Sequence, residues 1–259
     1  MDTVLGVSMA PTTVRTVLVE GENAEGVTVD EENFELPPNG DSATSSAPNQ
    51  VISAILVTRE GATQAGYALL STGVTWSDQV EAAALRDALA AHKMANVMLV
   101  SAFFAAAALA QTVGNATGYE QTALLFVEPE TATLGVVNAA DGSVADVHRE
   151  ILPEDDDEAV AKLVEMVSGA EALDAHPDAM FVVGSGVDIS LIKPVLKAAT
   201  SLPLSAPEEP ETALARGAAL ASAHAPLFAS STAALAYAQD PGVGAVNPVC
   251  GHAWLSLRT

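Results

Sequence analysis

The chain has few basic residues, few aromatic residues and almost no cysteine. It carries 10 lysines and arginines against 33 aspartates and glutamates, a formal net charge of −23 over 259 residues. Proteins that bind nucleic acid use lysine and arginine to neutralise phosphates, so this balance argues against a DNA-binding or RNA-binding protein. Anionic membrane surfaces are disfavoured for the same reason. The acidity either serves solubility or favours a protein partner with a basic surface.

The single cysteine, Cys250, excludes an intrachain disulfide and a cysteine-based metal site. The five histidines show no spacing typical of a zinc site, so no metal ligand is predicted. The N-terminus lacks the basic and apolar segments of a secretory signal, and the longest apolar run, Val97 to Gln111, is short for a membrane span. We therefore expect a cytoplasmic protein without a membrane-spanning helix.

Aromatic residues make up 4% of the chain, whereas hydrophobic residues as a whole make up 49%. This composition can bury a core large enough for one large domain or two lobes. Since aromatic residues are scarce, we expect the core to consist of alanine, valine, leucine and isoleucine.

Apolar patterning divides the chain into two blocks of the same plan, the second beginning at Tyr119. Each block opens with a strand–turn–strand hairpin, adds a third strand and then alternates helices with strands. Strands are predicted at residues 4–7, 14–19, 26–30, 67–74, 97–100, 123–127, 132–138 and 144–151. Helices are predicted from about residue 48 and at residues 78–92, 103–112 and 159–169.

Three segments need a more specific interpretation. The helix after Pro48 is expected to bury Val51, Ile52, Ile55 and Leu56 on one face. The acidic run at residues 154–158 is either a metal or basic-partner site or, as the residue types favour, a helix N-terminus whose acids complement the helix dipole. Residues 37–48 are predicted to be a loop, Ser77 a helix cap and residues 233–238 one more strand.

The segment from Met180 to Ala225 is the most informative part of the chain. It predicts a strand, a Gly-Ser-Gly turn, a helix, a short strand, a proline-rich turn and a helix of small residues. A glycine turn between a buried strand and a helix can hold a phosphate or sugar edge against backbone N–H groups. The same glycines, Gly184 and Gly186, can also simply permit a tight turn.

Five motifs together carry a resemblance to a known family. They are VVGSG at Val182–Gly186, Pro210 and Glu211, ALARGAAL at Ala213–Leu220, TWSDQVEAAALRDAL at Thr75–Leu89 and FFAAAALAQ at Phe103–Gln111. On these residues the chain resembles the nucleotide-binding domain of Hsp70 chaperones, within the actin-like ATPase superfamily, over about Val4 to Ala225. It also resembles an uncharacterised actinobacterial family of degenerate domains of this kind.

The resemblance implies an α/β fold with two lobes, of the actin-like ATPase (ribonuclease H-like) type. Residues 1–113 are expected to form lobe I, residues 114–225 lobe II, and residues 226–259 a terminal strand and a loose tail. Only one helix fits between Ile151 and Met180, and only a loop and one helix fit between Asp30 and Tyr67. We therefore expect reduced outer subdomains and a shallow cleft.

The residues that face phosphates in the family are changed at three places. Ser8 stands where the family has an aspartate that helps to hold Mg²⁺, and Pro11 stands where the family has a residue with an N–H. The second phosphate loop lacks its three glycines; Glu128 stands at its aspartate and Glu130 puts a carboxylate where phosphates would lie. The connecting helix has Ala102–Phe104 in place of the Asn-Glu-Pro that contains the family's hydrolysis-linked glutamate.

These changes imply a non-catalytic, Hsp70-like pseudo-ATPase that acts as a protein-interaction or regulatory scaffold. A nucleotide-binding sensor with little or no ATP hydrolysis is the alternative, and a modest ATPase in which Glu128 orients water or Mg²⁺ is a third possibility. No cofactor, catalytic residue or metal ligand is assigned. If ATP or ADP binds, the resemblance assigns its contacts to Ser8, Thr12, Thr13, Glu128, Thr131, Gly184, Ser185 and Gly186.

Overall fold

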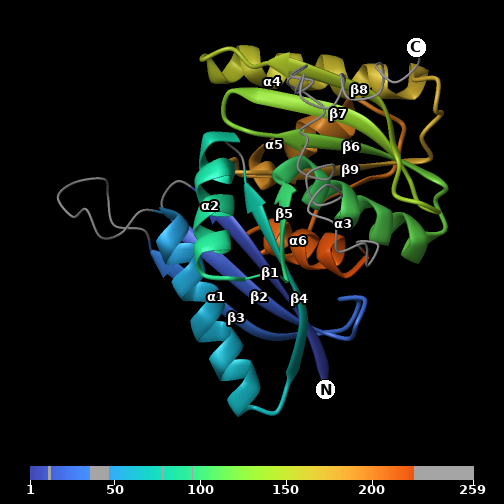
Figure 1. The fold of residues 1–259 in the computed structure, drawn as a ribbon. Coiled ribbons are helices and arrows are strands. Elements are labelled where there is room, and N and C mark those ends of the chain that lie inside the picture. Colours follow the sequence, from blue (N-terminus) through green and yellow to red (C-terminus); the bar gives the residue numbers. More distant parts are fainter. Residues whose placement is uncertain (11–12, 36–46, 77–78, 95, 225–259) are drawn as a thin grey trace, which may run out of the picture.

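A computed structural model describes residues 1–10, 13–35, 47–76, 79–94 and 96–224. These residues form two five-stranded sheets, one in each of two lobes, with helices outside the sheets and between them (Figure 1). The two-lobed α/β fold predicted from the sequence is thereby confirmed.

The first sheet begins with the predicted hairpin and is mixed. In spatial order its strands are β3 (Thr28–Glu35), β2 (Thr13–Glu20), β1 (Asp2–Ala10), β4 (Ala68–Trp76) and β5 (Val97–Ser101). β1 and β2 pair antiparallel as far as Ala10 opposite Thr13, so both strands run further than the sequence predicted. β4 and β5 extend the sheet in parallel on the other side of β1.

The second sheet repeats this plan. In spatial order its strands are β10 (Leu204–Ser205), β9 (Ala179–Gly184), β6 (Gln121–Val127), β7 (Thr131–Asn138) and β8 (Val144–Ile151). β6 and β7 form the antiparallel hairpin, and β9 lies parallel to β6 on its other side. The internal repeat of plan that the sequence indicated is therefore present in the structure.

Four helices cover the outer faces of the sheets. They are α1 (Ala47–Gln64) and α2 (Gln79–Ala91) on the first sheet, and α4 (Asp156–Gly169) and α5 (Ile189–Ala198) on the second. Val51, Ile52 and Ile55 of α1 are buried as predicted, but Leu56 is 41% exposed because the buried stripe of α1 is narrower than its apolar sequence. No described helix is both long and apolar enough to cross a membrane.

The acidic run at residues 154–158 begins α4. The side chain of Asp155 accepts hydrogen bonds from the backbone N–H groups of Asp157 and Glu158, and the first turn of the helix holds three acidic residues. Carboxylates at this end of a helix cap its free N–H groups and complement its dipole. The interpretation as a capped helix N-terminus is therefore confirmed.

Two helices of small residues, α3 (Ala102–Thr117) and α6 (Ala213–His224), lie between the two sheets (Figure 1). A side chain on Gly6 of β1 or on Gly73 of β4 would overlap the backbone carbonyls of Ala215 and Ala218 in α6. A side chain on Gly217 of α6 would likewise overlap the backbone of Ala105 in α3. Because these positions lack Cβ atoms, α6 lies directly against the first sheet and against α3.

Several predicted segments lie outside the described residues. They are most of the loop at residues 37–48, the cap at Ser77, the strand at residues 233–238 and the tail at residues 226–259.

We expect Gly73→Ala to destabilise the protein by about 1–3 kcal/mol or more, because the added Cβ must displace a helix backbone rather than a flexible side chain. Gly61→Ala is the control, since Gly61 is an exposed residue of α1 with no atom within 4 Å of the place where a Cβ would lie. It should stabilise the protein by about 0.5–1 kcal/mol. Denaturant unfolding measures both changes, and equal effects would contradict the close packing of α6.

A second prediction concerns Glu171, which lies in the short 3₁₀ helix η1 (Ala170–Ala172). Its carboxylate accepts hydrogen bonds from the Ser201 N–H at 2.6 Å and from the hydroxyls of Thr200 and Ser201, which lower its pKa below the ordinary value of 4.5. A lowered pKa means that the ionised carboxylate stabilises the fold.

Glu171→Gln should therefore lower the melting temperature at neutral pH. This difference from the unmodified protein should shrink as the pH falls from 4.5 through the lowered pKa of the folded state. Thermal melts of both proteins across this range test the sign. A difference that is constant with pH would show that the charge of Glu171 does not stabilise this turn.

Candidate functional site

A small cavity lies where the two lobes meet, and we call it the cleft cavity. Its volume is about 20 Å³, which is enough for about one water molecule. Residues of both lobes form its wall: Trp76, Ser101, Ala102, Phe103, Phe126, Glu128, Thr133 and Arg149. The structure thus brings the end of β4 and the start of α3 against the β6–β7 hairpin and β8.

Strand register directs Arg149 into the cleft cavity. Arg149 of β8 lies opposite Thr133 of β7, and both line the cavity. The next residue, Glu150, lies on the opposite face of β8, where its carboxylate is 3.6 Å from Lys162 of α4. This alternation follows from the two-residue period of a strand.

Arg149 and Glu128 form a half-buried charged pair at the turn after β6. The Arg149 Nη2 lies 3.8 Å from the Glu128 Oε2, and it also donates a hydrogen bond to the Thr131 hydroxyl at 3.3 Å. That hydroxyl donates to Glu128 at 3.1 Å. The carboxylate that the resemblance placed at the aspartate of the second phosphate loop is thus paired with a cation of the protein itself.

Aromatic side chains form the remainder of the cavity wall. Phe103 is 4% exposed and packs edge-to-face on Phe126, with 6.2 Å between ring centroids. Phe103 belongs to the central core, and its neighbour Phe104 packs against that core. Trp76 is 3% exposed, and its indole Nε1 has no hydrogen-bond partner among the described residues.

The first hairpin contributes less to this region than the resemblance implied. Ser8 is buried in β1 opposite Arg15, and neither Ser8 nor Thr13 lines the cleft cavity. Thr12 lies outside the described residues. Arg15 forms an ion pair with Glu211, just before α6, so the hairpin is tied to the second half of the chain.

The backbone geometry of the turn after β9 favours glycine at both of its glycine positions. A side chain on Gly184 would overlap the Val187 carbonyl, and Gly186 has φ +72°, where L-residues are strained. The Ser185 N–H donates to the Val127 carbonyl at 2.8 Å, so the turn is fastened to the β6–β7 hairpin. These features account for a tight turn without a ligand.

A hollow of about 80 Å³ lies beside this turn. It is lined by Gly184, by Ser190 and Lys193 of α5, and by Pro207 and Pro210. It places a cation and a hydroxyl close to the Val182–Gly186 motif, which is part of the Hsp70-like resemblance. No group of three or more His, Cys, Asp or Glu residues in the described ranges could hold a metal ion.

Of the eight residues that the resemblance assigned to a nucleotide, Glu128 lines the cleft cavity and Gly184 lines the hollow beside the turn after β9. Glu128 and Thr131 contact each other, the Gly184–Gly186 turn is fastened to the same hairpin, and Ser8 and Thr13 lie in β1 and β2. The assignment of these residues to a nucleotide stays a prediction. Sequence reasoning missed Trp76 and Arg149. The only sequence signal for these two residues was that their types are rare, since the chain has 2 tryptophans and 10 basic residues.

Residues 2–233 match the model of a family described as "Family of unknown function (DUF7159)". No curated protein matches the chain.

Solved structures share the fold at low sequence identity. The ROK hexokinase from Thermus thermophilus is 15% identical, with a TM-score of 0.57 over 84% of this chain and 97% of that chain. The inorganic polyphosphate/ATP-glucomannokinase from Arthrobacter sp. strain KM is 16% identical, with a TM-score of 0.57 over 86% and 99%. A chain of the PilM–PilN type IV pilus biogenesis complex is 12% identical, with a TM-score of 0.53 over 85% and 98%.

These likenesses show the actin-like ATPase fold that the sequence predicted. They include sugar kinases and a chain of a pilus biogenesis complex, so the fold alone does not separate catalysis from assembly. The finer resemblance to Hsp70 stays a prediction.

Trp76 offers a test of the cleft cavity. We expect Trp76→Phe to be nearly neutral, because the lost indole N–H has no partner among the described residues. Trp76→Ala should cost about 3–5 kcal/mol, because it leaves a void between the lobes. Urea unfolding followed by circular dichroism measures both. If Phe is as costly as Ala, the indole N–H makes a stabilising bond and this description of the cavity is wrong.

Proposed function

We propose that this chain, which belongs to the family of unknown function DUF7159, is a non-catalytic domain with the actin-like ATPase fold. In this proposal the domain serves as a protein-interaction or regulatory scaffold.

The occupied cleft is the observation that carries the proposal. Phosphoryl transfer depends on positioning phosphates and neutralising their charge, and Mg²⁺ is held there by carboxylates together with phosphate oxygens. Here Arg149 engages the carboxylate of Glu128, and the indole of Trp76 lines the same cavity. A space of about 20 Å³ is far smaller than the sites of about 300–1,000 Å³ that typically hold small molecules.

The joint between the lobes also supports a scaffold. One buried apolar cluster runs through β1, α3, α6, β6 and β9, and therefore joins the two sheets. The Arg216 guanidinium of α6 adds hydrogen bonds to the Gly26 carbonyl and the Thr28 hydroxyl on the first lobe. Large apolar interfaces oppose relative motion of lobes. A fixed joint suits a protein that presents a constant surface.

A nucleotide-binding sensor is the second candidate. The Hsp70-like resemblance favours it, because the Val182–Gly186 motif, which contains three of the residues assigned to ATP or ADP, is retained. The hollow beside that turn adds Lys193 and Ser190, which could contact a sugar or phosphate. In this candidate the nucleotide would bind against lobe II without reaching Glu128.

Titration calorimetry with ATP and with ADP, each with and without Mg²⁺, separates these candidates. We expect no binding heat and no thermal shift at millimolar nucleotide, because the residues that line the cleft, among them Arg149, Trp76 and Phe103, leave a space of only about 20 Å³. A known nucleotide-binding protein measured in the same buffer serves as the positive control.

Binding that is lost in Lys193→Ala but kept in Lys197→Ala would overturn the scaffold proposal and support the sensor. Both lysines are on α5, and only Lys193 lines the hollow beside Gly184. Release of phosphate from Mg²⁺-ATP that Glu128→Gln abolishes would instead support an ATPase.

A further inference from the structure

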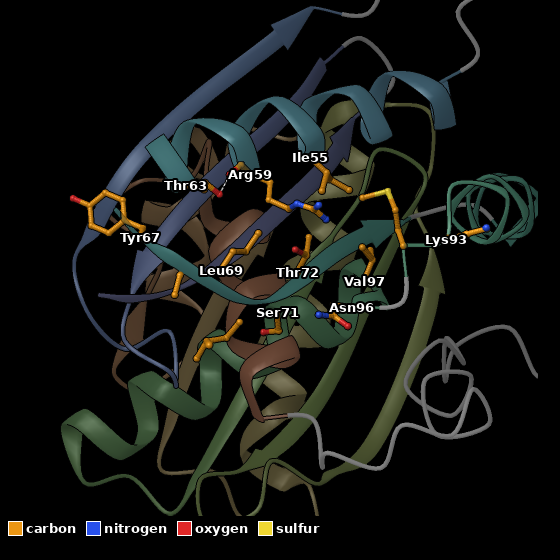
Figure 2. Close-up of a pocket in the computed structure, with 13 residues that line it drawn as sticks. Ile55, Arg59, Thr63, Tyr67, Leu69, Ser71, Thr72, Lys93, Asn96 and Val97 are labelled. Carbon is orange, nitrogen blue, oxygen red and sulfur yellow. Dashed lines mark hydrogen bonds between the residues drawn. The ribbon is translucent and has the colours of Figure 1, made fainter. Parts of the chain in front are cut away.

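A second hollow lies on lobe I, away from the cleft, and we call it the edge groove (Figure 2). Its volume is about 420 Å³. Three segments line it. The helix α1 contributes Ile55 and Arg59, and the strand β4 contributes Leu70 and Ser71. The connection from α2 to β5 contributes Lys93 and Asn96. It belongs to neither the cleft cavity nor the turn after β9.

The edge groove contains an uncovered length of sheet. β4 begins at Ala68, but its pairing with β5 begins only at Thr72, opposite Val97. Residues 68–71 of β4 therefore have no strand partner on the β5 side within the described residues. On the β1 side the register steps from Leu69 to Ser71, so Leu70 is skipped there. Backbone groups at such an edge are a template for an added strand.

The charge of the edge groove is opposite to that of the molecule. Arg59 and Lys93 are two of only 10 basic residues in a chain with 33 acidic ones. Among the described residues neither forms an ion pair, as is also true of Lys193, Lys197 and Arg216, whereas Arg15, Arg86, Arg149 and Lys162 each have an acidic partner. Figure 2 shows Arg59 extending from α1 over β4 toward Thr72. Two cations without carboxylate partners make this a local site for a negative group.

Apolar side chains complete the edge groove. Ile55 is buried at its base, and Leu69, Met94 and Val97 are partly buried around it. Leu70 is 43% exposed. Apolar pockets beside an open strand edge are where an added strand places its alternate side chains.

We propose that the edge groove binds an extended segment of a partner protein, which adds to the sheet along residues 68–71 and places an acidic side chain against Arg59, while Lys93 adds positive charge at another part of the groove. The segment lies beside β4, on the line that β5 would follow if it were longer. Main-chain hydrogen bonds hold it there, and the two cations select its charge. A free small anion would use the cations and leave the sheet edge uncovered.

This inference goes beyond the scaffold proposal and does not depend on an inactive cleft. The edge groove and the cleft cavity share no residue. Nucleotide titration tests the cleft and peptide binding tests the edge groove, so failure of one is distinguishable from failure of the other.

Selection from a random octapeptide display library on the full chain provides the test. We expect the enriched peptides to carry aspartate or glutamate among apolar residues. Fluorescence anisotropy then gives the affinity of a synthetic enriched peptide. Arg59→Glu should weaken binding by about tenfold or more, equivalent to about 1.4 kcal/mol. Arg86→Glu is the matched control, since Arg86 is also exposed on an outer helix of lobe I, and it should leave the affinity unchanged.

Hydrogen exchange tests the added strand itself. Bound peptide should slow amide exchange within residues 69–71, and inorganic phosphate at the same concentration should not. Ala68 is left out of this comparison because its N–H already donates to the Met1 carbonyl. The proposal is overturned if no peptide is enriched, if enriched peptides lack acidic residues, or if Arg59→Glu and Arg86→Glu act equally. It is also overturned if bound peptide slows no amide within residues 69–71, or if Arg59→Glu changes the oligomeric state, since a second copy of the chain would then fill the edge groove.

Discussion

The direct contact of α6 with the first sheet and with α3 is the constraint on which the remainder of the structure depends. It exists because Gly6, Gly73 and Gly217 have no side chains where backbone carbonyls must fit. α6 follows the second sheet in the chain but packs on the first, so this contact joins the two lobes. Three glycines add to the conformational entropy that folding must overcome, and the close packing they permit gives a continuous apolar core built largely from small residues.

The narrowness of the cleft follows from this contact of α6 with the first sheet and with α3. With α3 held between the sheets, its first residues bring Phe103 against Phe126, next to Trp76 at the end of β4. The cleft is therefore narrow before any charge is considered. Arg149 then engages Glu128, the carboxylate that could otherwise have faced a metal ion. Packing and electrostatics together therefore favour a fixed surface over a ligand site that opens and closes. The edge groove is part of that surface and is positively charged, unlike the rest of the molecule.

Much of the fold could be predicted from the sequence, whereas little of the site could. The strand at residues 144–151 was predicted with its observed bounds, and the Met180–Ala225 segment was predicted in its observed order. Both rest on apolar periodicity, which is a local property. Arg149 and Trp76 line the cleft cavity with Glu128 but were not predicted, because strand register and the packing of the two lobes bring them there and no local pattern marks them. Leu56 was predicted to be buried but is exposed, because periodicity gives the direction of the apolar face of a helix but not its width.

By itself the sequence determined the elements, the doubled plan and the small-residue core, because each depends on residue types at short spacing. Through the Hsp70-like resemblance it also predicted that the residues facing phosphates are changed. Only the tertiary structure decided what replaced those residues. The register of β8 on β7 turned Arg149 inward, and the difference in length between β4 and β5 left residues 68–71 uncovered beside Arg59. These relations join residues far apart in the chain, and pairing register is set by the packing of the whole sheet rather than by any local pattern.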